Sequence, residues 1–380
     1  MAQPKLKDAP KQPAAATGHR YNALSVGDPA PWFTQDCTSN PIYAFDTAAG
    51  RYIVLCFFSS SSHEDSQEAL SILKTNRKLF DDKKISFFGV SFDPTDKRDG
   101  HVTEVLPGIR HFWDFDGRVG KMYGVLPIDG GQQIRVRPRW FILDPQMRVM
   151  KVVPFTNDGK HKKDVVDFLK KLPPVHLSNG LEIQAPVLYL PNVFEPELCE
   201  KLIGMYEANG GTDSGFMRQV GAKTVAVKDY NVKRRSDFTL TDQQTIADIR
   251  QRIRRRIIPE IQKAHSFNAT HIERFLVGCY HSNTGDHFRA HRDNLTLGTA
   301  HRRFAVSINL NSEFSGGEVS FPEYGPRSFK PPVGGAVVFN CSLLHEVSPV
   351  TKGRRFAFLP FLYDEAAAKI RQANAKALDA

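Results

Sequence analysis

The segment from residue 273 to residue 363 constrains this chain more than any other. It contains His291-Arg292-Asp293, a distant His345 and an arginine at Arg355. Residues two apart on an extended chain share one face, so His291 and Asp293 can both point into a barrel, and His345 can join them from another strand. Two histidines and one carboxylate hold iron(II) and leave adjacent coordination positions open. We therefore predict that His291, Asp293 and His345 form a catalytic iron site.

Open positions on the metal suit O2 and a chelating keto acid such as 2-oxoglutarate, whose far carboxylate then needs a fixed cation. Arg355 fits this role because a guanidinium binds a carboxylate in a bidentate fork. Tyr280 can add a hydroxyl donor, and Asn309 is a third candidate for the co-substrate site. Arg354 would lie on the opposite face of the strand. A register shift of one residue would make Arg354 the anchor instead, and the sequence leaves this open.

The same segment resembles the 2-oxoglutarate/iron(II)-dependent oxygenases, in their prolyl-4-hydroxylase-like subgroup. The matching residues are Cys279-Tyr280, His291-Arg292-Asp293, Leu310-Asn311, Gly316-Gly317-Glu318, 332–339, 345–350 and Arg355. The resemblance covers about residues 183–365 and implies a double-stranded β-helix (jelly-roll) domain with flanking helices. It also implies a hydroxylase that uses iron(II), 2-oxoglutarate and O2, releases succinate and CO2, and takes ascorbate as a reductant. Collagen-type members carry a lysine where Arg355 stands, so this chain is more similar to the arginine-using members.

The front of the chain alternates apolar, strand-like runs with helical patterns. Residues 52–58 (YIVLCFF) and 85–92 (ISFFGVSF) are continuous apolar runs, typical of strands buried on both faces. A helical pattern over residues 66–80 separates them, and another over residues 162–172 follows the later strands. This alternation predicts an α/β sheet.

This region resembles the thioredoxin-like fold in its peroxiredoxin branch. The matching stretches are 26–31, 52–58, 90–93, 123–125 and 138–144. The resemblance implies that Pro138 is a cis-proline facing the active site. It also implies a reactive cysteine after the central strand, but residues 59–67 (SSSSHEDSQ) contain none, and Cys56 lies inside the strand. We therefore expect the front domain to have lost thiol chemistry and to act as a scaffold, a partner-binding surface or a substrate-docking module.

These patterns divide the chain into five parts. We expect a disordered arm over residues 1–20, a thioredoxin-like domain over 21–172, a linker over 173–182, an oxygenase domain over 183–365, and a C-terminal helix or tail over 366–380. Leu172-Pro173-Pro174 ends the first domain because proline does not continue a helix. Within the second domain we expect a mobile loop over residues 209–220 and one long helix over 242–265, kinked at Pro259.

Composition limits the cellular compartment and the partners that the sequence favours. Five scattered cysteines without a C-x-x-C pair argue against a disulfide framework and favour a reducing cytoplasm. No apolar run is long enough to span a bilayer. The net charge of +10 includes the run Arg252, Arg254, Arg255 and Arg256, which we interpret as a solvated helix face, so a nucleic-acid partner is not expected.

The sequence favours hydroxylation of a protein or peptide side chain, proline included, on the subgroup resemblance alone. Arg234, Arg235 and Asp237 are candidates to line a substrate groove, although a surface turn explains them equally well. Two alternatives stay open: an oxygenase of a free small molecule such as an amino acid or metabolite, and a non-catalytic redoxin-like binding or sensing module. The prime substrate and the oligomeric state are not determined by the sequence.

Overall fold

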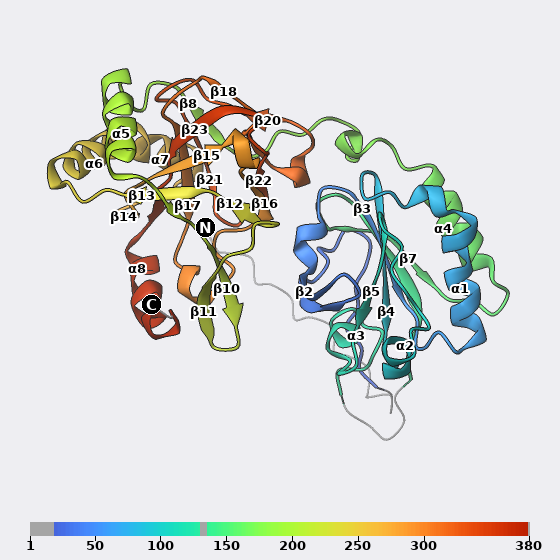
Figure 1. The fold of residues 1–380 in the computed structure, drawn as a ribbon. Helices are drawn as coiled ribbons and strands as arrows, with labels where there is room; N and C mark the ends of the chain where they lie inside the picture. Colours follow the sequence, from blue (N-terminus) through green and yellow to red (C-terminus); the bar gives the residue numbers. More distant parts are fainter. Residues whose placement is uncertain (1–18, 130–134, 379–380) are drawn as a thin grey trace, which may run out of the picture. The chain divides into compact units, whose positions relative to one another are not determined.

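The computed structural model describes residues 19–129 and 135–378, so most of the expected N-terminal arm lies outside the described residues. Contacts divide the described chain into two units (Figure 1). The first comprises residues up to 46 and residues 52–172, and the second comprises residues 47–51 and the chain from residue 173 onward. We propose that residues 173–182 link the two domains.

The first unit is a mixed seven-stranded sheet with helices. The strand order is β2-β1-β5-β4-β3-β6-β7, in which β3, β4 and β5 are parallel and the other pairs are antiparallel. The strands are β1 (Thr34–Cys37), β2 (Asn40–Ala44), β3 (Tyr52–Phe57), β4 (Ile85–Ser91), β5 (Ile109–Trp113), β6 (Arg139–Leu143) and β7 (Val149–Pro154). The helices are η1 (Phe45–Ala48), α1 (Glu64–Thr75), η2 (Arg77–Leu79), α2 (Pro94–Arg98), α3 (Arg118–Met122) and α4 (Lys160–Lys170). Every residue of β3 and β4 is buried, including Ser86 and Ser91, which explains why their sequences are predominantly apolar.

The expected cis-proline is wrong. Among the described residues the cis peptide bond is Leu106–Pro107, not the bond before Pro138. The Arg137 amide donates to the Val125 carbonyl, and the Pro138 carbonyl accepts from the Phe155 amide. These bonds hold Pro138 in extended chain leading directly into β6, where a trans peptide fits.

The second unit is built on antiparallel strands. Its ten-stranded sheet contains β8 (Leu188–Leu190), β9 (Thr212–Asp213), β13 (Ser236–Thr239), β14 (His271–Glu273), β15 (Leu276–His281), β17 (Phe304–Asn309), β18 (Phe314–Ser315), β21 (Ala336–Asn340), β23 (Lys352–Phe358) and β24 (Phe361–Tyr363). The five-stranded sheet has the order β12 (Lys233–Arg234), β16 (His287–His291), β22 (His345–Val347), β19 (Val319–Ser320), β20 (Ser328–Phe329). A separate hairpin joins β10 (Phe216–Val220) to β11 (Lys223–Val227).

One apolar cluster contains residues of both sheets, among them Tyr280, Phe339 and Phe361 of the larger sheet and Val319 and Val347 of the smaller. The two sheets therefore enclose a common interior, as a jelly roll requires. A second cluster joins the other face of the larger sheet to helices α5 (Pro196–Asn209), α6 (Gln243–Arg256) and α7 (Ile258–His265). The remaining helical elements are η3 (Val175–Leu177), η4 (Ser282–Thr284), η5 (Leu297–Thr299), η6 (Pro322–Tyr324), α8 (Glu365–Ala373) and η7 (Ala375–Ala377).

Two local expectations for this unit are corrected. Residues 209–220 are not an open loop, because β10 forms a regular ladder with β11 through five residue pairs. The expected long helix is two helices that meet at Ile257, just before Pro259, because proline cannot continue the hydrogen-bonding pattern and is accommodated in the first turn of α7. None of the helices within residues 19–129 and 135–378 has the length and apolar character needed to cross a membrane.

Candidate functional site

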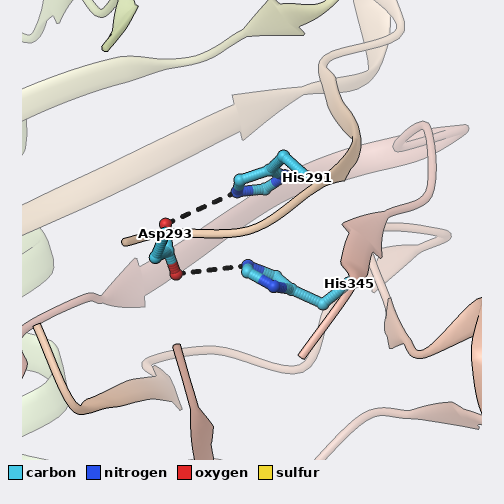
Figure 2. A group of neighbouring side chains, drawn as sticks. All are labelled: His291, Asp293 and His345. Atoms are coloured by element: carbon cyan, nitrogen blue, oxygen red, sulfur yellow. Dashed lines mark ion pairs between the residues drawn. The ribbon is translucent and has the colours of Figure 1, made fainter. Parts of the chain in front are cut away.

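The three expected metal ligands converge. His291 ends β16, Asp293 follows it, and His345 opens β22, which is hydrogen-bonded to β16 with His291 opposite His345. One potential ligand atom from each lies within 4.8 Å of the other two. Figure 2 shows both imidazoles pointing toward the carboxylate: Nε2 of His291 is 3.6 Å and Nε2 of His345 is 3.3 Å from an Asp293 oxygen.

The hydrogen bonds of the two imidazoles suit a metal ion. His291 Nδ1 donates to the Arg289 carbonyl at 2.8 Å, and His345 Nδ1 donates to the Leu343 carbonyl at 3.0 Å. Because a carbonyl only accepts, Nδ1 carries a proton in each ring, which leaves Nε2 as the atom of each ring that can bind a metal.

Electrostatics favours the metal-binding forms of His291 and Asp293. Burial, with the neighbouring His345, lowers the pKa of His291 to about 4, so this imidazole is neutral, as a metal ligand must be. Burial alone would raise the pKa of Asp293, but His345 and His291 lower it well below its ordinary value. A neutral imidazole and an anionic carboxylate are ligands that suit iron(II). The bound iron would supply O2 activation, while these residues hold it and leave coordination positions open.

Arg355 of β23 points into the barrel and is 1% exposed. Its Nε donates to Asn309 Oδ1 at 3.1 Å, its Nη2 donates to Ser307 Oγ at 2.7 Å, and its Nη1 is buried without a partner. Among the described residues no carboxylate pairs with it. Gly317 makes room for the side chain, since a Cβ there would stand 3.0 Å from Arg355 Cδ.

Arg354 points the other way and pairs with Glu207 at 2.7 Å. The strand alternation assumed from the sequence is therefore the one that the structure has. Tyr280 lies opposite Arg355 on β15, with its ring centre 5.4 Å from the guanidinium carbon. Asn309 also donates to the Pro331 carbonyl at 2.8 Å, so its amide bonds to Arg355 and the backbone. The sequence analysis missed Ser307, which the two-residue alternation with Asn309 could have indicated.

Arg234, Arg235 and Asp237, the candidates for a substrate groove, do not form a surface turn, because Arg235 is buried. Arg235 is buried and donates to both carboxylate oxygens of Asp237 at 2.6 Å, and its Nη1 lies 3.4 Å from the Tyr280 hydroxyl. Arg234 is 40% exposed, and its Nε is 3.5 Å from an Asp286 oxygen. Arg234 and Arg235 line a cavity of about 410 Å³, whose other walls are Asp213, Tyr230, Ser236, His281, Asn283, Thr284 and Asp286. Asp237 does not line this cavity.

The flanking histidines have other partners. His301 Nε2 lies 2.8 Å from a Glu273 oxygen, His287 Nδ1 donates to the Gly285 carbonyl, and His281 Nδ1 accepts from the Asn283 amide. None of them belongs to the cluster of possible metal ligands.

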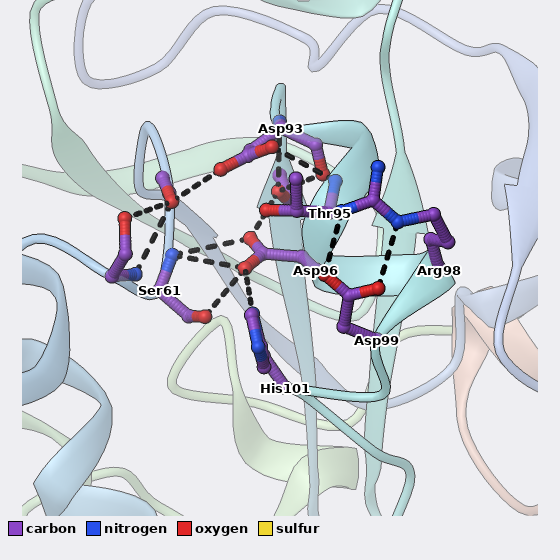
Figure 3. Close-up of polar contacts among 10 residues, drawn as sticks. Ser61, Asp93, Thr95, Asp96, Arg98, Asp99 and His101 are labelled. Atoms are coloured by element: carbon purple, nitrogen blue, oxygen red, sulfur yellow. Dashed lines mark hydrogen bonds and ion pairs between the residues drawn. The ribbon is translucent and has the colours of Figure 1, made fainter.

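In the first unit, the loop after β3 is fixed by hydrogen bonds to a buried carboxylate (Figure 3). Asp96 accepts from the backbone amide and the hydroxyl of Ser61 and from the hydroxyl of Ser91. Ser60 donates to Asp93 at 2.7 Å. Cys56 is fully buried inside β3, and burial raises the pKa of its thiol well above the ordinary value. A thiol in this state is a poor nucleophile.

Comparison with known proteins matches two separate segments of the chain to families. Residues 26–152 match the AhpC/TSA family, and residues 275–363 match the 2OG-Fe(II) oxygenase superfamily. A PKHD-type hydroxylase of Hyphomonas neptunium is 31% identical over 94 residues, which are 23% of this chain and 41% of that protein. This chain spans 41% to 48% of the length of four curated PKHD-type hydroxylases that it matches.

Two solved structures are similar at lower identity. A Trichoplax adhaerens prolyl hydroxylase, in complex with a hypoxia-inducible factor peptide, is 16% identical with a TM-score of 0.40, covering 56% of this chain and 95% of that one. Peroxidoxin BcpB of Mycobacterium tuberculosis is 17% identical with a TM-score of 0.33, covering 40% and 99%. The chain thus joins a peroxiredoxin-like AhpC/TSA-family domain to a 2OG-Fe(II) oxygenase domain related to the PKHD-type hydroxylases, for which iron(II) and 2-oxoglutarate are the implied cofactors.

Proposed function

We propose that this protein is an iron(II)- and 2-oxoglutarate-dependent dioxygenase that hydroxylates a C–H bond of a protein or peptide side chain, with proline as the first residue to test. Succinate and CO2 are the co-products. His291, Asp293 and His345 bind the metal, Arg355 binds the far carboxylate of 2-oxoglutarate, and Tyr280 contributes a hydroxyl to that end of the pocket.

The observation that carries the co-substrate assignment is the isolated charge of Arg355. A buried cation without a carboxylate is costly, because the charge has lost its water and gained no counter-ion. Arg355 retains an unpartnered Nη1 in the interior of the same barrel that holds the three metal-ligand candidates. A carboxylate of 2-oxoglutarate would supply the missing counter-ion in bidentate geometry.

The preference for a peptide over a free small molecule rests on weaker support. The relatives are PKHD-type hydroxylases, and the residues that line the cavity beside Arg234 and Arg235 are polar or charged. Its two carboxylates accept hydrogen bonds from neighbouring groups: Asp213 accepts from the Tyr230 hydroxyl, and Asp286 accepts from the Thr284 hydroxyl and the His281 amide. The side chains of Arg234, Ser236 and Asn283 on the same wall can donate to or accept from a peptide backbone. The five cysteines are buried and free of disulfides, which supports a reducing compartment. We therefore propose that the protein is cytoplasmic.

Anaerobic titration of the protein with iron(II) and 2-oxoglutarate tests the metal and co-substrate assignment. We expect the weak visible charge-transfer band of the chelated metal, and we expect His291→Ala or His345→Ala to abolish it. His265→Ala is the matched control because His265 lies on helix α7, and it should leave the band unchanged. A band of equal intensity in all variants would reject the assignment.

A further inference from the structure

A buried carboxylate connects the two segments of the chain that carry the candidate metal ligands. Glu323 lies on η6, and its side chain is 10% exposed. Its Oε1 accepts a hydrogen bond from Arg292 Nη2 at 2.8 Å. Its Oε2 accepts one from Arg292 Nη1 and one from the Leu344 backbone amide, both at 3.2 Å. One side chain thus bonds both segments from a third element of the fold.

These bonds are made next to all three ligands. Arg292 separates His291 from Asp293, and Leu344 directly precedes His345. Because side chains alternate along an extended chain, the two ligands that flank Arg292 face the shared centre, while Arg292 is directed away from it and toward the buried carboxylate. The carboxylate is therefore one residue removed from each ligand.

The sheet alone does not fix the ligands. The ladder between β16 and β22 ends at the pair of histidines, so Asp293 lies beyond it. Outside that ladder, the Asp293 amide donates to the Cys341 carbonyl at 3.0 Å, and Arg292 Nη1 also donates to the Ser342 carbonyl. Both acceptors belong to the turn between β21 and β22. The position of Asp293 relative to His345 therefore depends on hydrogen bonds made outside the ladder.

The element that carries Glu323 is itself anchored. Phe321, two residues before it, is 1% exposed, and its ring centre lies 5.0 Å from that of Phe339 and 5.8 Å from that of Phe329. All three rings belong to the apolar cluster that the two sheets share. A carboxylate on such an anchored turn can hold the groups that it bonds in place.

The pair of Glu323 and Arg292 supplies geometry more than stability. Moving two charges out of water costs about as much free energy as their attraction returns, so a buried ion pair gives little net stability relative to apolar residues of the same size. The hydrogen bonds between a guanidinium and a carboxylate are strong and directional. The two charges also cancel, so the pair adds no net charge beside the metal site.

We propose that Glu323 is a positioning residue of the iron site: through Arg292 and the Leu344 amide it fixes the distance between the Asp293 carboxylate and the His345 imidazole. This inference rests on the proposed function for the metal itself. Glu323 acts on the ligands through the backbone of their neighbours.

Cobalt(II) is the probe for the test, because its visible absorption reports coordination number and geometry without turnover. The metal-free full chain is titrated anaerobically with cobalt(II) alone. Glu323→Gln keeps the size of the side chain and removes its charge, and we expect it to raise the Kd of cobalt(II) about tenfold and to alter the visible spectrum. Glu323→Asp keeps the charge but has a shorter reach, and should raise the Kd only about threefold.

Glu273→Gln is the matched control. Glu273 is also 10% exposed and accepts from two nitrogens of one arginine, but its partners, Arg302 and His301, belong to neither ligand-bearing segment. This variant should lower the free energy of unfolding, as Glu323→Gln does, while the Kd of cobalt(II) and its spectrum stay those of the wild type. Thermal melts followed by circular dichroism verify the folding of each variant.

A double variant separates geometry from charge. Arg292→Met/Glu323→Gln removes both charges, so no unpaired cation remains beside the metal. Because the link between the two segments is still broken, we expect the weak binding of cobalt(II) to persist. Recovery of the wild-type Kd would show that Glu323 acts through its charge alone and would overturn the positioning role.

An unchanged Kd and spectrum in Glu323→Gln, or an equal change in Glu273→Gln, would also overturn the inference. If Glu323→Gln does not fold, Glu323→Asp decides: weaker binding with an altered spectrum supports the role, and wild-type behaviour rejects it. A wild type that binds neither cobalt(II) nor iron(II) defeats the proposed function and this inference with it. Wild-type binding that Glu323→Gln leaves intact defeats this inference alone.

Discussion

Asn309 Oδ1 accepts a hydrogen bond from Arg355 Nε at 3.1 Å, while its own amide donates to the Pro331 carbonyl. Asn309 thus fixes the guanidinium on which the proposed co-substrate site depends. Loss of one hydrogen bond to a buried charged group costs about 1.5–3 kcal/mol. We predict that Asn309→Ala raises the Kd of 2-oxoglutarate roughly tenfold or more, as measured by anaerobic titration of the charge-transfer band.

Asn311 provides the matched control. It is also an asparagine, two residues further along, but its side chain bonds the backbone of Arg354 and Phe356 and does not touch the Arg355 side chain. Asn311→Ala should leave the Kd of 2-oxoglutarate near that of the wild type. If the two variants weakened 2-oxoglutarate equally, Asn309 would have no specific role in positioning Arg355.

A second prediction compares the two neighbouring arginines. Arg355→Met should weaken 2-oxoglutarate binding by about a hundredfold or more, because it removes a buried bidentate partner. Arg354→Met should have little effect, since the exposed pair with Glu207 contributes at most about 1 kcal/mol. Calorimetric titration of 2-oxoglutarate into the iron-loaded protein measures both, and a reversed order would identify Arg354 as the anchor.

The sequence was most informative where residue spacing alone determines side-chain direction. A two-residue spacing brought His291 and Asp293 to one face, and strand alternation separated Arg355 from Arg354. Continuous apolar runs identified β3 and β4 because both faces of these strands are buried. These predictions need only local geometry, so they can be made without knowledge of the tertiary structure.

Features that depend on distant partners were not predictable in this way. The hydrogen bonds of Asp96 with Ser61 join distant segments of the chain, and no residue spacing reveals such contacts. The isomer of the peptide bond before Pro138 depends on its hydrogen-bonded surroundings, and the family resemblance placed the cis bond at the wrong proline. The glycines and polar residues of 209–220 favour a loop, so the ladder that β10 forms with β11 is not predictable from them.

The buried pair of Arg235 and Asp237 yields a prediction about stability. Burial alone would raise the pKa of Asp237, but the neighbouring charge of Arg235 lowers it to about 2. Asp237→Ala leaves Arg235 buried and unpaired and should lower the free energy of unfolding by about 3–5 kcal/mol. The double variant Arg235→Met/Asp237→Leu should lose less, because neither charge remains buried alone.

Thermal melts followed by circular dichroism measure this loss. All three tryptophans, Trp32, Trp113 and Trp140, lie in the first unit, so their fluorescence separately reports the unfolding of that unit and should not shift in either variant. A double variant less stable than Asp237→Ala would show that the pair is not the source of the effect.

The first unit should not reduce peroxides. The loop that carries a reactive cysteine in peroxiredoxins is here held by Asp96 through Ser61, and Cys56 is fully buried with a raised pKa. We expect no turnover of hydrogen peroxide or an alkyl hydroperoxide with a dithiol reductant, and the same null result for Cys56→Ser. Robust turnover that Cys56→Ser abolished would contradict the assignment of this unit as a scaffold or docking module.

His111 predicts a pH-dependent stability of the first unit. It is 2% exposed on β5, its Nδ1 has no partner, and burial lowers its pKa from 6.5 to about 4. Between these two values the unfolded chain binds a proton that the folded chain does not, so the unfolding free energy must fall as the pH drops from 6.5 toward 4. From pH 7 to pH 5 this single group should remove about 2 kcal/mol. Denaturant titrations of the wild type and His111→Leu, followed by tryptophan fluorescence at both pH values, should show a smaller pH-dependent loss in the variant. Parallel losses in the two proteins would mean that His111 is protonated as readily in the folded chain as in the unfolded one.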